Sequence, residues 1–208
     1  MKVLNLAAAA VLVAGSASAV TFSDSFGPEL TNSSGVVTLP FYDGSLPLIG
    51  VHIELAVDFD SEGTVTNTGG TAAELGALTM YMASLTDDDM FPVGTGISAD
   101  AMDMETYAAT APGGSAAVSL SGSGTSGVIS LPNVMDFVGS GTFDLSYSQM
   151  ATAFFSSGNG NASGVVDTSG SGIVTITYKT EVIPVPGALP LLATGLAGLG
   201  FLARRRKV

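Results

Sequence analysis

Apolar and polar residues alternate along several segments of this chain, most clearly between residues 51 and 59. There every odd position is apolar, and the even positions hold His, Glu, Ala and Asp. Successive side chains of a strand point to opposite faces of its sheet, so a period of two predicts a strand with one buried face. The side chains predicted to be buried are Val51, Ile53, Leu55, Val57 and Phe59.

Similar but shorter patterns predict further strands, and glycine-rich segments predict the turns between them. The further strand segments are 36–41, 64–67, 116–121, 127–131, 142–148 and 172–182. Clusters of Gly, Ser and Asn at 121–127 and 156–164 are typical of turns, because glycine adopts positive φ freely. Residues 71–85 fit either a helix or a strand.

Many short strands with turns between them are typical of an all-β fold. We expect a single antiparallel β-sandwich, or a partly closed barrel, over residues 20–182. About 160 residues are enough to bury one sizeable core, so a single domain is expected.

Acidic residues dominate this middle part of the chain. It holds 18 Asp and Glu against Lys179 alone, a net charge of −17 with His52 neutral. Such a surface repels nucleic acid and anionic lipid, so no nucleic-acid partner is expected. The chain has no Cys, which excludes disulfides and thiolate metal sites.

The N-terminus has the pattern of an export signal. Lys2 precedes an apolar run at 4–14, and small residues at 17–19 follow it. Signal peptidase is therefore expected to cut between Ala19 and Val20, which makes residues 1–19 a signal peptide. The apolar run is too short for an uncleaved membrane anchor.

The other end of the chain, residues 183–208, combines a proline motif, an apolar run at 188–203 and a basic end. The motif residues are Ile183, Pro184, Val185, Pro186 and Gly187, and the basic residues are Arg204, Arg205, Arg206 and Lys207. A transmembrane helix over 190–203 would be about 20 Å long, and a bilayer core is about 30 Å thick. The basic end would stay in the cytoplasm. A tail anchor without processing is the alternative.

This arrangement resembles the PEP-CTERM class of bacterial sorting signals, in the variant named for Val-Pro-Leu-Pro-Ala. The two prolines match, the aliphatic positions are conservative changes, and Gly187 replaces a small Ala. The resemblance implies that an exosortase, a membrane-embedded transpeptidase-like enzyme, recognises 183–208. The precursor would sit in the inner membrane of a Gram-negative bacterium and then reach the cell surface or be secreted.

A second resemblance covers most of residues 20–182. The segments 21–23, 39–46, 51–55, 65–67, 139–143 and 173–178 look like the choice-of-anchor type E domain. Phe41-Tyr42-Asp43 stands where that family has Phe-Asp, so one residue is inserted or shifted there. The family carries no established catalytic residues, so the resemblance implies no active site.

Few residues suggest chemistry. His52, the only histidine, lies on the polar face of its strand, and no nucleophile elbow accompanies it. Asp58, Asp60 and Glu62, followed by Gly63, match the first half of a calcium loop, although position twelve is Gly69 instead of Glu. An acidic strand end followed by a turn is the alternative, and no other cofactor is expected.

We therefore expect a structural or adhesive protein of the cell surface or extracellular matrix, and not an enzyme. Exopolysaccharide is one expected partner. A calcium-dependent carbohydrate-binding module is the alternative function, and a secreted hydrolase is a third.

Overall fold

The structure is a computed structural model that describes residues 18–44, 46–87, 91 and 96–181. Most of the predicted signal peptide and the whole of the predicted sorting signal, 183–208, lie outside these residues, as does the membrane helix expected at 190–203. Within the described ranges, no helix is long and apolar enough to cross a membrane.

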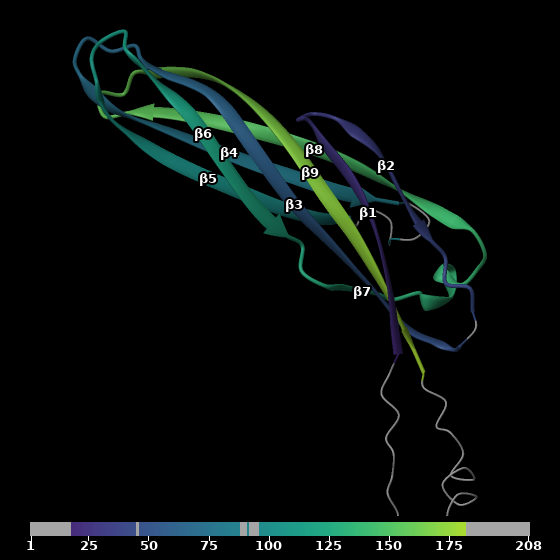
Figure 1. The fold of residues 1–208 in the computed structure, drawn as a ribbon. Helices are drawn as coiled ribbons and strands as arrows, with labels where there is room; N and C mark the ends of the chain where they lie inside the picture. Colours follow the sequence, from purple (N-terminus) through teal and green to yellow (C-terminus); the bar gives the residue numbers. More distant parts are fainter. Residues whose placement is uncertain (1–17, 45, 88–90, 92–95, 182–208) are drawn as a thin grey trace, which may run out of the picture.

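The described residues form strands and one short helix (Figure 1). The strands are β1 Ser18–Leu30, β2 Ser34–Pro40, β3 Leu48–Asn67, β4 Ala73–Thr86, β5 Ile97–Thr110, β6 Ser115–Thr125, β7 Ile129–Leu131, β8 Thr142–Ser157 and β9 Ala162–Thr180. The 3₁₀ helix η1 spans Val134–Phe137.

The strands divide into two antiparallel sheets that face each other. The order in the five-stranded sheet is β1-β9-β3-β6, with β7 also paired to β3, and the order in the four-stranded sheet is β2-β8-β4-β5. The buried side chains of both sheets form one hydrophobic core, and the rings of Phe59 and Tyr81 stack across it at 5.9 Å. The expected all-β sandwich is confirmed.

The alternation predicted for residues 51–59 is also confirmed. Val51, Ile53, Leu55, Val57 and Phe59 are at most 2% exposed. The alternate residues of this strand face outward, as the polar half of the pattern requires. The segment 172–182 behaves in the same way up to the end of β9, where Val174, Ile176 and Tyr178 are 0% exposed.

Two separate predicted strands, 51–59 and 64–67, are parts of the single strand β3. The predicted strand end and turn around Gly63 is therefore wrong. A Cβ at Gly63 would lie 2.0 Å from the carbonyl oxygen of Val165 on β9, so this glycine allows two backbones to approach closely.

The predicted turns at 121–127 and 156–164 are shorter than expected. β6 continues to Thr125, β8 to Ser157, and β9 starts at Ala162. Residues 71–85 are mostly strand β4, which settles the choice between helix and strand. β1 and β5 were not predicted at all, because their apolar positions are few or irregular.

One carboxylate crosses between the sheets at each side of the sandwich. Asp24 of β1 accepts a hydrogen bond from the Thr38 amide of β2 at 2.7 Å, and Asp103 of β5 accepts one from the Ser121 amide of β6 at 3.2 Å. Both amides belong to edge strands, whose free N–H groups would otherwise be open to another chain. The two contacts also tie the sheets together at their margins.

β1 begins and β9 ends at the same end of the sandwich. Ser18, the first residue of β1, pairs with Thr180, the last residue of β9 (Figure 1). The loops after β3, β5 and β8 gather at the opposite end. β3 has 20 residues, and at about 3.3 Å per residue it runs for about 65 Å. The sandwich is therefore elongated, with a base where β1 begins and β9 ends and a far tip made of loops.

A buried asparagine ties the three tip loops together. The Asn67 side chain is 0% exposed, and its amide group donates to the carbonyl oxygens of Thr71 and Thr110 at 2.8 Å each. Its oxygen accepts from the Gly69 amide and from the Asn159 side chain. One residue thus holds the loops after β3, β5 and β8 in a fixed relation.

Candidate functional site

The carboxylates predicted to bind calcium lie in the middle of a strand and not in a loop. Asp58, Asp60 and Glu62 belong to β3 and are exposed on the outer face of the five-stranded sheet. On a strand, residues two positions apart project from the same face, and they are about 6.6 Å apart along the strand. A calcium loop instead wraps its ligands around the ion. The predicted loop geometry is therefore wrong.

Across the described part of the chain, no group of three or more His, Cys, Asp and Glu side chains is placed to hold a metal ion. Calcium binding by Asp58, Asp60 and Glu62 stays a prediction.

The single histidine lies where its strand pattern indicated. His52 is half-buried on the outer face, and its Nδ1 is 3.4 Å from the hydroxyl of Ser130, which is directly opposite on β7. That geometry is a cross-strand contact between two polar side chains. The absence of enzymatic activity stays a prediction.

The outer face of the four-stranded sheet is different in character, because apolar side chains cover its centre. They come from β4, β5 and β8, and we call them the methionine face: Leu78, Met80, Met82, Met102, Met104, Met150 and Phe154. Five of the eight methionines of the chain belong to it. Met102 and Met104 are 66% and 69% exposed, and Phe154 is 52% exposed.

Strand register brings these side chains together. Met80 lies opposite Met102, and Leu78 lies opposite both Met104 and Phe154. Met82 lies opposite Met150 on the other neighbouring strand. Side chains opposite each other on one face are about 5 Å apart at Cβ, so the set forms one continuous apolar surface.

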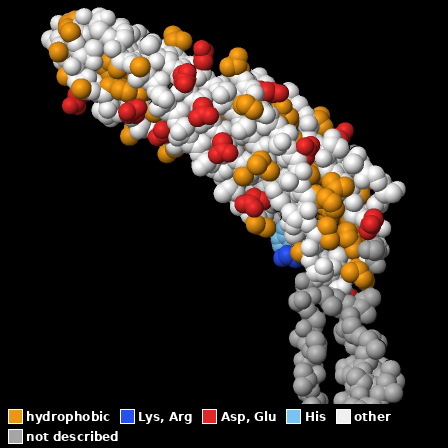
Figure 2. All heavy atoms as spheres, viewed as in Figure 1, with side chains coloured by type: hydrophobic (Ala, Val, Ile, Leu, Met, Phe, Trp, Pro, Cys, Tyr) orange, Lys and Arg blue, Asp and Glu red, His pale blue; other side chains and the backbone are white. Residues whose placement is uncertain are grey.

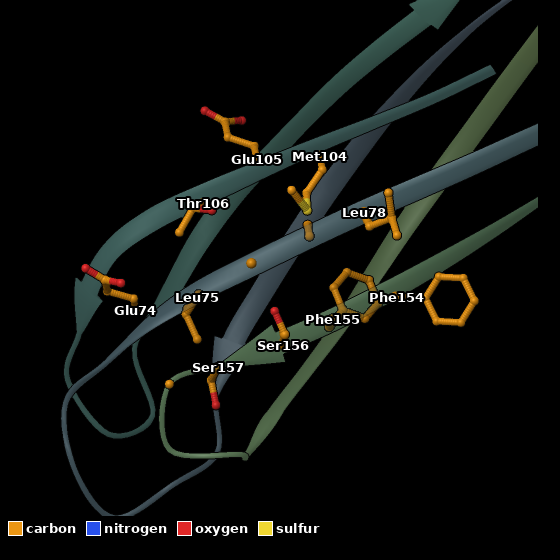
Figure 3. A pocket seen from close by; sticks show the side chains of 13 residues that line it. Glu74, Leu75, Leu78, Met104, Glu105, Thr106, Phe154, Phe155, Ser156 and Ser157 are labelled. Carbon is orange, nitrogen blue, oxygen red and sulfur yellow. The ribbon is translucent and has the colours of Figure 1, made fainter.

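This surface contains two adjoining hollows. The larger, about 590 Å³, is lined by Met80, Met82, Met102 and Met150. The smaller, about 450 Å³, lies toward the tip and is lined by Leu78 and Met104, among others (Figure 3). Phe154 lines both. Together they form one shallow groove along β4.

Acidic side chains accompany the groove. Glu74 lines the smaller hollow on the side away from Phe154, whereas Glu105 alternates with Met104 and points to the other side of β5 (Figure 3). Asp100 lines the larger hollow. Lys179, the one lysine or arginine among the described residues, lies on β9 of the other sheet. Figure 2 shows the face that bears the lysine and the histidine, which belongs to the five-stranded sheet, and carboxylates lie along that face too. The groove is therefore apolar along its centre and negative at its margins.

The floor of the groove is rigidly held from the core side. Tyr81 lies between Met80 and Met82 on β4 but points inward, and its hydroxyl donates to the Gln149 side-chain oxygen at 2.6 Å. Burial, with smaller contributions from Tyr147 and Asp58, raises the pKa of Tyr81 to about 12. A neutral, hydrogen-bonded tyrosine thus fixes β4 to β8 beneath the exposed methionines.

Sequence reasoning did not find this surface. Leu78, Met80 and Met82 alternate, which supported a strand, but nothing indicated that their face would remain exposed. Met102 and Met104 lie on β5, a strand that was not predicted. Methionines two residues apart in two segments were the available signal.

Comparisons with known proteins do not identify the chain. No family model matches it, and no curated protein matches it. Among solved structures, a mud crab tombus-like virus structure matches with a TM-score of 0.21 and 12% identity, over 91% of this chain and 93% of that chain. A structure of infectious bursal disease virus, Gx strain, matches with a TM-score of 0.18 and 14% identity, over 88% of this chain and 43% of that one. Similarities at these TM-scores carry no argument about the fold or the function.

Proposed function

We propose that this protein is an exported structural or adhesive protein of the cell surface or extracellular matrix of a Gram-negative bacterium. In this proposal signal peptidase removes residues 1–19, and an exosortase processes residues 183–208 at the inner membrane. The observation that carries the proposal is that β1 begins and β9 ends side by side. β9 ends at Thr180, at the base of the sandwich, directly before the proline motif.

The geometry suits a protein held by one end. An anchor after β9 would hold the sandwich at its base, and strands of about 65 Å would carry the tip loops away from the membrane. The far tip is internally braced by Asn67, and loops on a rigid scaffold are common sites of recognition. Adhesion or matrix contact at the tip agrees with this arrangement.

Charge also agrees with an extracellular role. One lysine against 18 carboxylates keeps the domain soluble and repels anionic lipid. A tethered domain of this charge would stand off an anionic membrane surface. Exopolysaccharide remains a proposed partner without an assigned site.

The predicted cleavage point agrees with removal of the signal before folding. Ala19 and Val20 lie in β1, opposite Lys179 and Tyr178 of β9. A peptide bond inside a paired strand is poorly accessible to a protease, so the cut must precede the pairing of β1 with β9. After it, residues 20–30 still pair with β9, and N-terminal sequencing of the exported protein should begin at Val20.

The proposal is tested by replacing Pro184 and Pro186 with Ala. The alanines would let the helix extend upstream and hide the recognition segment, so uncut precursor should accumulate in the inner membrane. Pro132 to Ala, between β7 and η1, is the matched control and should sort normally.

Fractionation with and without the exosortase gives the decisive comparison. If the double alanine variant reaches the cell surface at normal size and rate, the sorting proposal is wrong and the segment is a plain tail anchor. Deletion of 183–208 should release a folded domain into the periplasm, because β1 to β9 end before it.

A further inference from the structure

The two outer faces of the sandwich differ in a way that their exposure to water does not explain. Along β3, the outer face of the five-stranded sheet presents Glu54, Asp58, Asp60 and Glu62. Serines of β6 and β9 lie opposite Asp58 and Asp60, and Asp167 of β9 lies opposite Glu62. The outer face of the four-stranded sheet presents the methionine face at its centre. A sheet that is apolar on both faces normally has a packed layer on each of them.

We propose that the methionine face binds a basic, amphipathic helix of a partner protein. The N–H and C=O groups of a sheet lie in its plane, so the face of a sheet offers an incoming segment no backbone hydrogen bonds. A helix suits such a face because it satisfies its own backbone hydrogen bonds. From Glu74 to Met82, β4 runs for about 27 Å, which is the length of a helix of about 18 residues. An apolar stripe on such a helix would fill both hollows.

Charge selects the partner. Glu74 and Asp100 lie on the groove face, and none of the residues lining either hollow is basic. Lys and Arg at the margins of the apolar stripe would lie beside these carboxylates and speed association. A second copy of this domain, with 18 carboxylates and one lysine, would bring like charges together at the contact.

The chemistry of methionine agrees with this assignment. Its side chain is unbranched and polarizable, so it adapts to the shape of an incoming apolar surface and contacts aromatic rings favourably. Helices bound in apolar grooves contribute side chains at spacings of three and four residues. The methionine face is thus suited to the apolar stripe of a helix more than to one fixed small ligand.

The test uses two synthetic helical peptides of about 18 residues, five turns, with the same leucine stripe. One carries lysine and the other glutamate on the polar positions. The full chain, in zwitterionic lipid nanodiscs, carries ¹³C-methyl methionine, and empty nanodiscs correct for binding to lipid. The lysine peptide should bind and shift the methyl signals of the methionine face. Met135 on η1, which is 74% exposed and outside the face, should not shift.

Paired variants separate this site from general attraction to an acidic protein. Met80→Ser with Met102→Ser should weaken the binding of the lysine peptide about tenfold. The control is Val36→Ser with Val165→Ser, two exposed valines outside the groove that are 55% and 71% exposed. Binding by the control should stay within about twofold. Thermal melts should show both variants folded, because all four side chains are exposed.

A second pair tests the charges. Glu74→Gln with Asp100→Asn should weaken the binding more than Asp58→Asn with Glu62→Gln, which removes equal charge from the other face. Equal losses in the two pairs would overturn the proposal, as would equal binding of the lysine and glutamate peptides. If the protein binds neither peptide but loses self-association when Met80 and Met102 are replaced, a second copy of the chain is the occupant. That outcome also refutes the proposal. None of these outcomes depends on how residues 183–208 are processed.

Discussion

The most informative single substitution is Gly170→Ala, because a strand glycine here makes room for an aromatic ring. Gly170 lies in β9, and a Cβ at this position would lie 2.1 Å from Cε2 of Tyr81 on the facing sheet. The ring cannot easily move away. Tyr81 is 1% exposed, its hydroxyl is bound to Gln149 at 2.6 Å, and its ring stacks on Phe59.

The size of the effect follows from two opposing terms. Forcing an extra methyl group into a packed core costs about 1–3 kcal/mol. Replacing glycine by alanine also restricts the unfolded chain, which stabilises a protein by about 0.4–1 kcal/mol where the native backbone accepts it. We expect Gly170→Ala to lower the free energy of unfolding by about 1–2 kcal/mol, a range around the difference between the midpoints of these two terms.

Urea denaturation measures this change, and Gly70→Ala provides the control. A Cβ at Gly70 meets no atom within 4 Å, so this variant should be neutral or slightly stabilised. Combining Gly170→Ala with Tyr81→Leu should cost less than the sum of the two single changes, because the ring that clashes has been removed. If Gly170→Ala is as stable as Gly70→Ala, the glycine does not serve the ring and the packing argument fails.

Three further predictions follow from the core, its tyrosines and the tip. Ile53→Asp should destabilise the fold by several kcal/mol, because it buries an unpaired charge at a 1% exposed position. The control Glu54→Gln should be nearly neutral. Equal shifts of the two variants in urea melts would mean that the predicted register of the strand is wrong. Tyrosines of the unfolded chain ionise near pH 10, and burial raises the pKa of Tyr81 to about 12. The folded state therefore keeps a proton that the unfolded state releases, so the free energy of unfolding should be constant below about pH 10 and fall above it. The urea midpoint of Tyr81→Phe should drop less with rising pH than that of the unsubstituted protein. An equal drop in both proteins would exclude Tyr81 as the cause. Asn67→Asp should destabilise the fold by more than about 1 kcal/mol and speed hydrogen exchange in all three tip loops, because a buried carboxylate would face the carbonyl oxygens of Thr71 and Thr110. Faster exchange in one loop alone would contradict the bridging role of Asn67.

The fold class could be predicted from the sequence because alternation is a local property of the chain. In the strands around Ile53 and Ile176, alternation over about ten residues is enough to indicate which face is buried. β1 and β5 escaped prediction for a related reason. Phe26 is the one buried residue of β1, and the outward positions of β5 include apolar Met102 and Met104, so neither strand alternates clearly.

The glycines show where reading the sequence locally misleads. The run around Gly170 and Gly172 has the composition of a turn or a linker, yet it is the centre of β9. A Cβ at Gly172 would lie 2.3 Å from the Phe26 ring, as one at Gly170 would from Tyr81. Glycine in these positions accommodates rings that are more than 80 residues away along the chain, and no local pattern contains that information.

The sequence by itself therefore determined the all-β class, the buried face of the clearest strands, the acidic surface and the candidate signals at both ends. The tertiary structure decided that Asp58, Asp60 and Glu62 lie along a strand, and that the start of β1 and the end of β9 meet at the base. It also assembled the methionine face from β4, β5 and β8. The physical reason is that periodicity reports which side of a strand is apolar, while only the pairing of distant strands decides which side chains become neighbours and which apolar face is left uncovered.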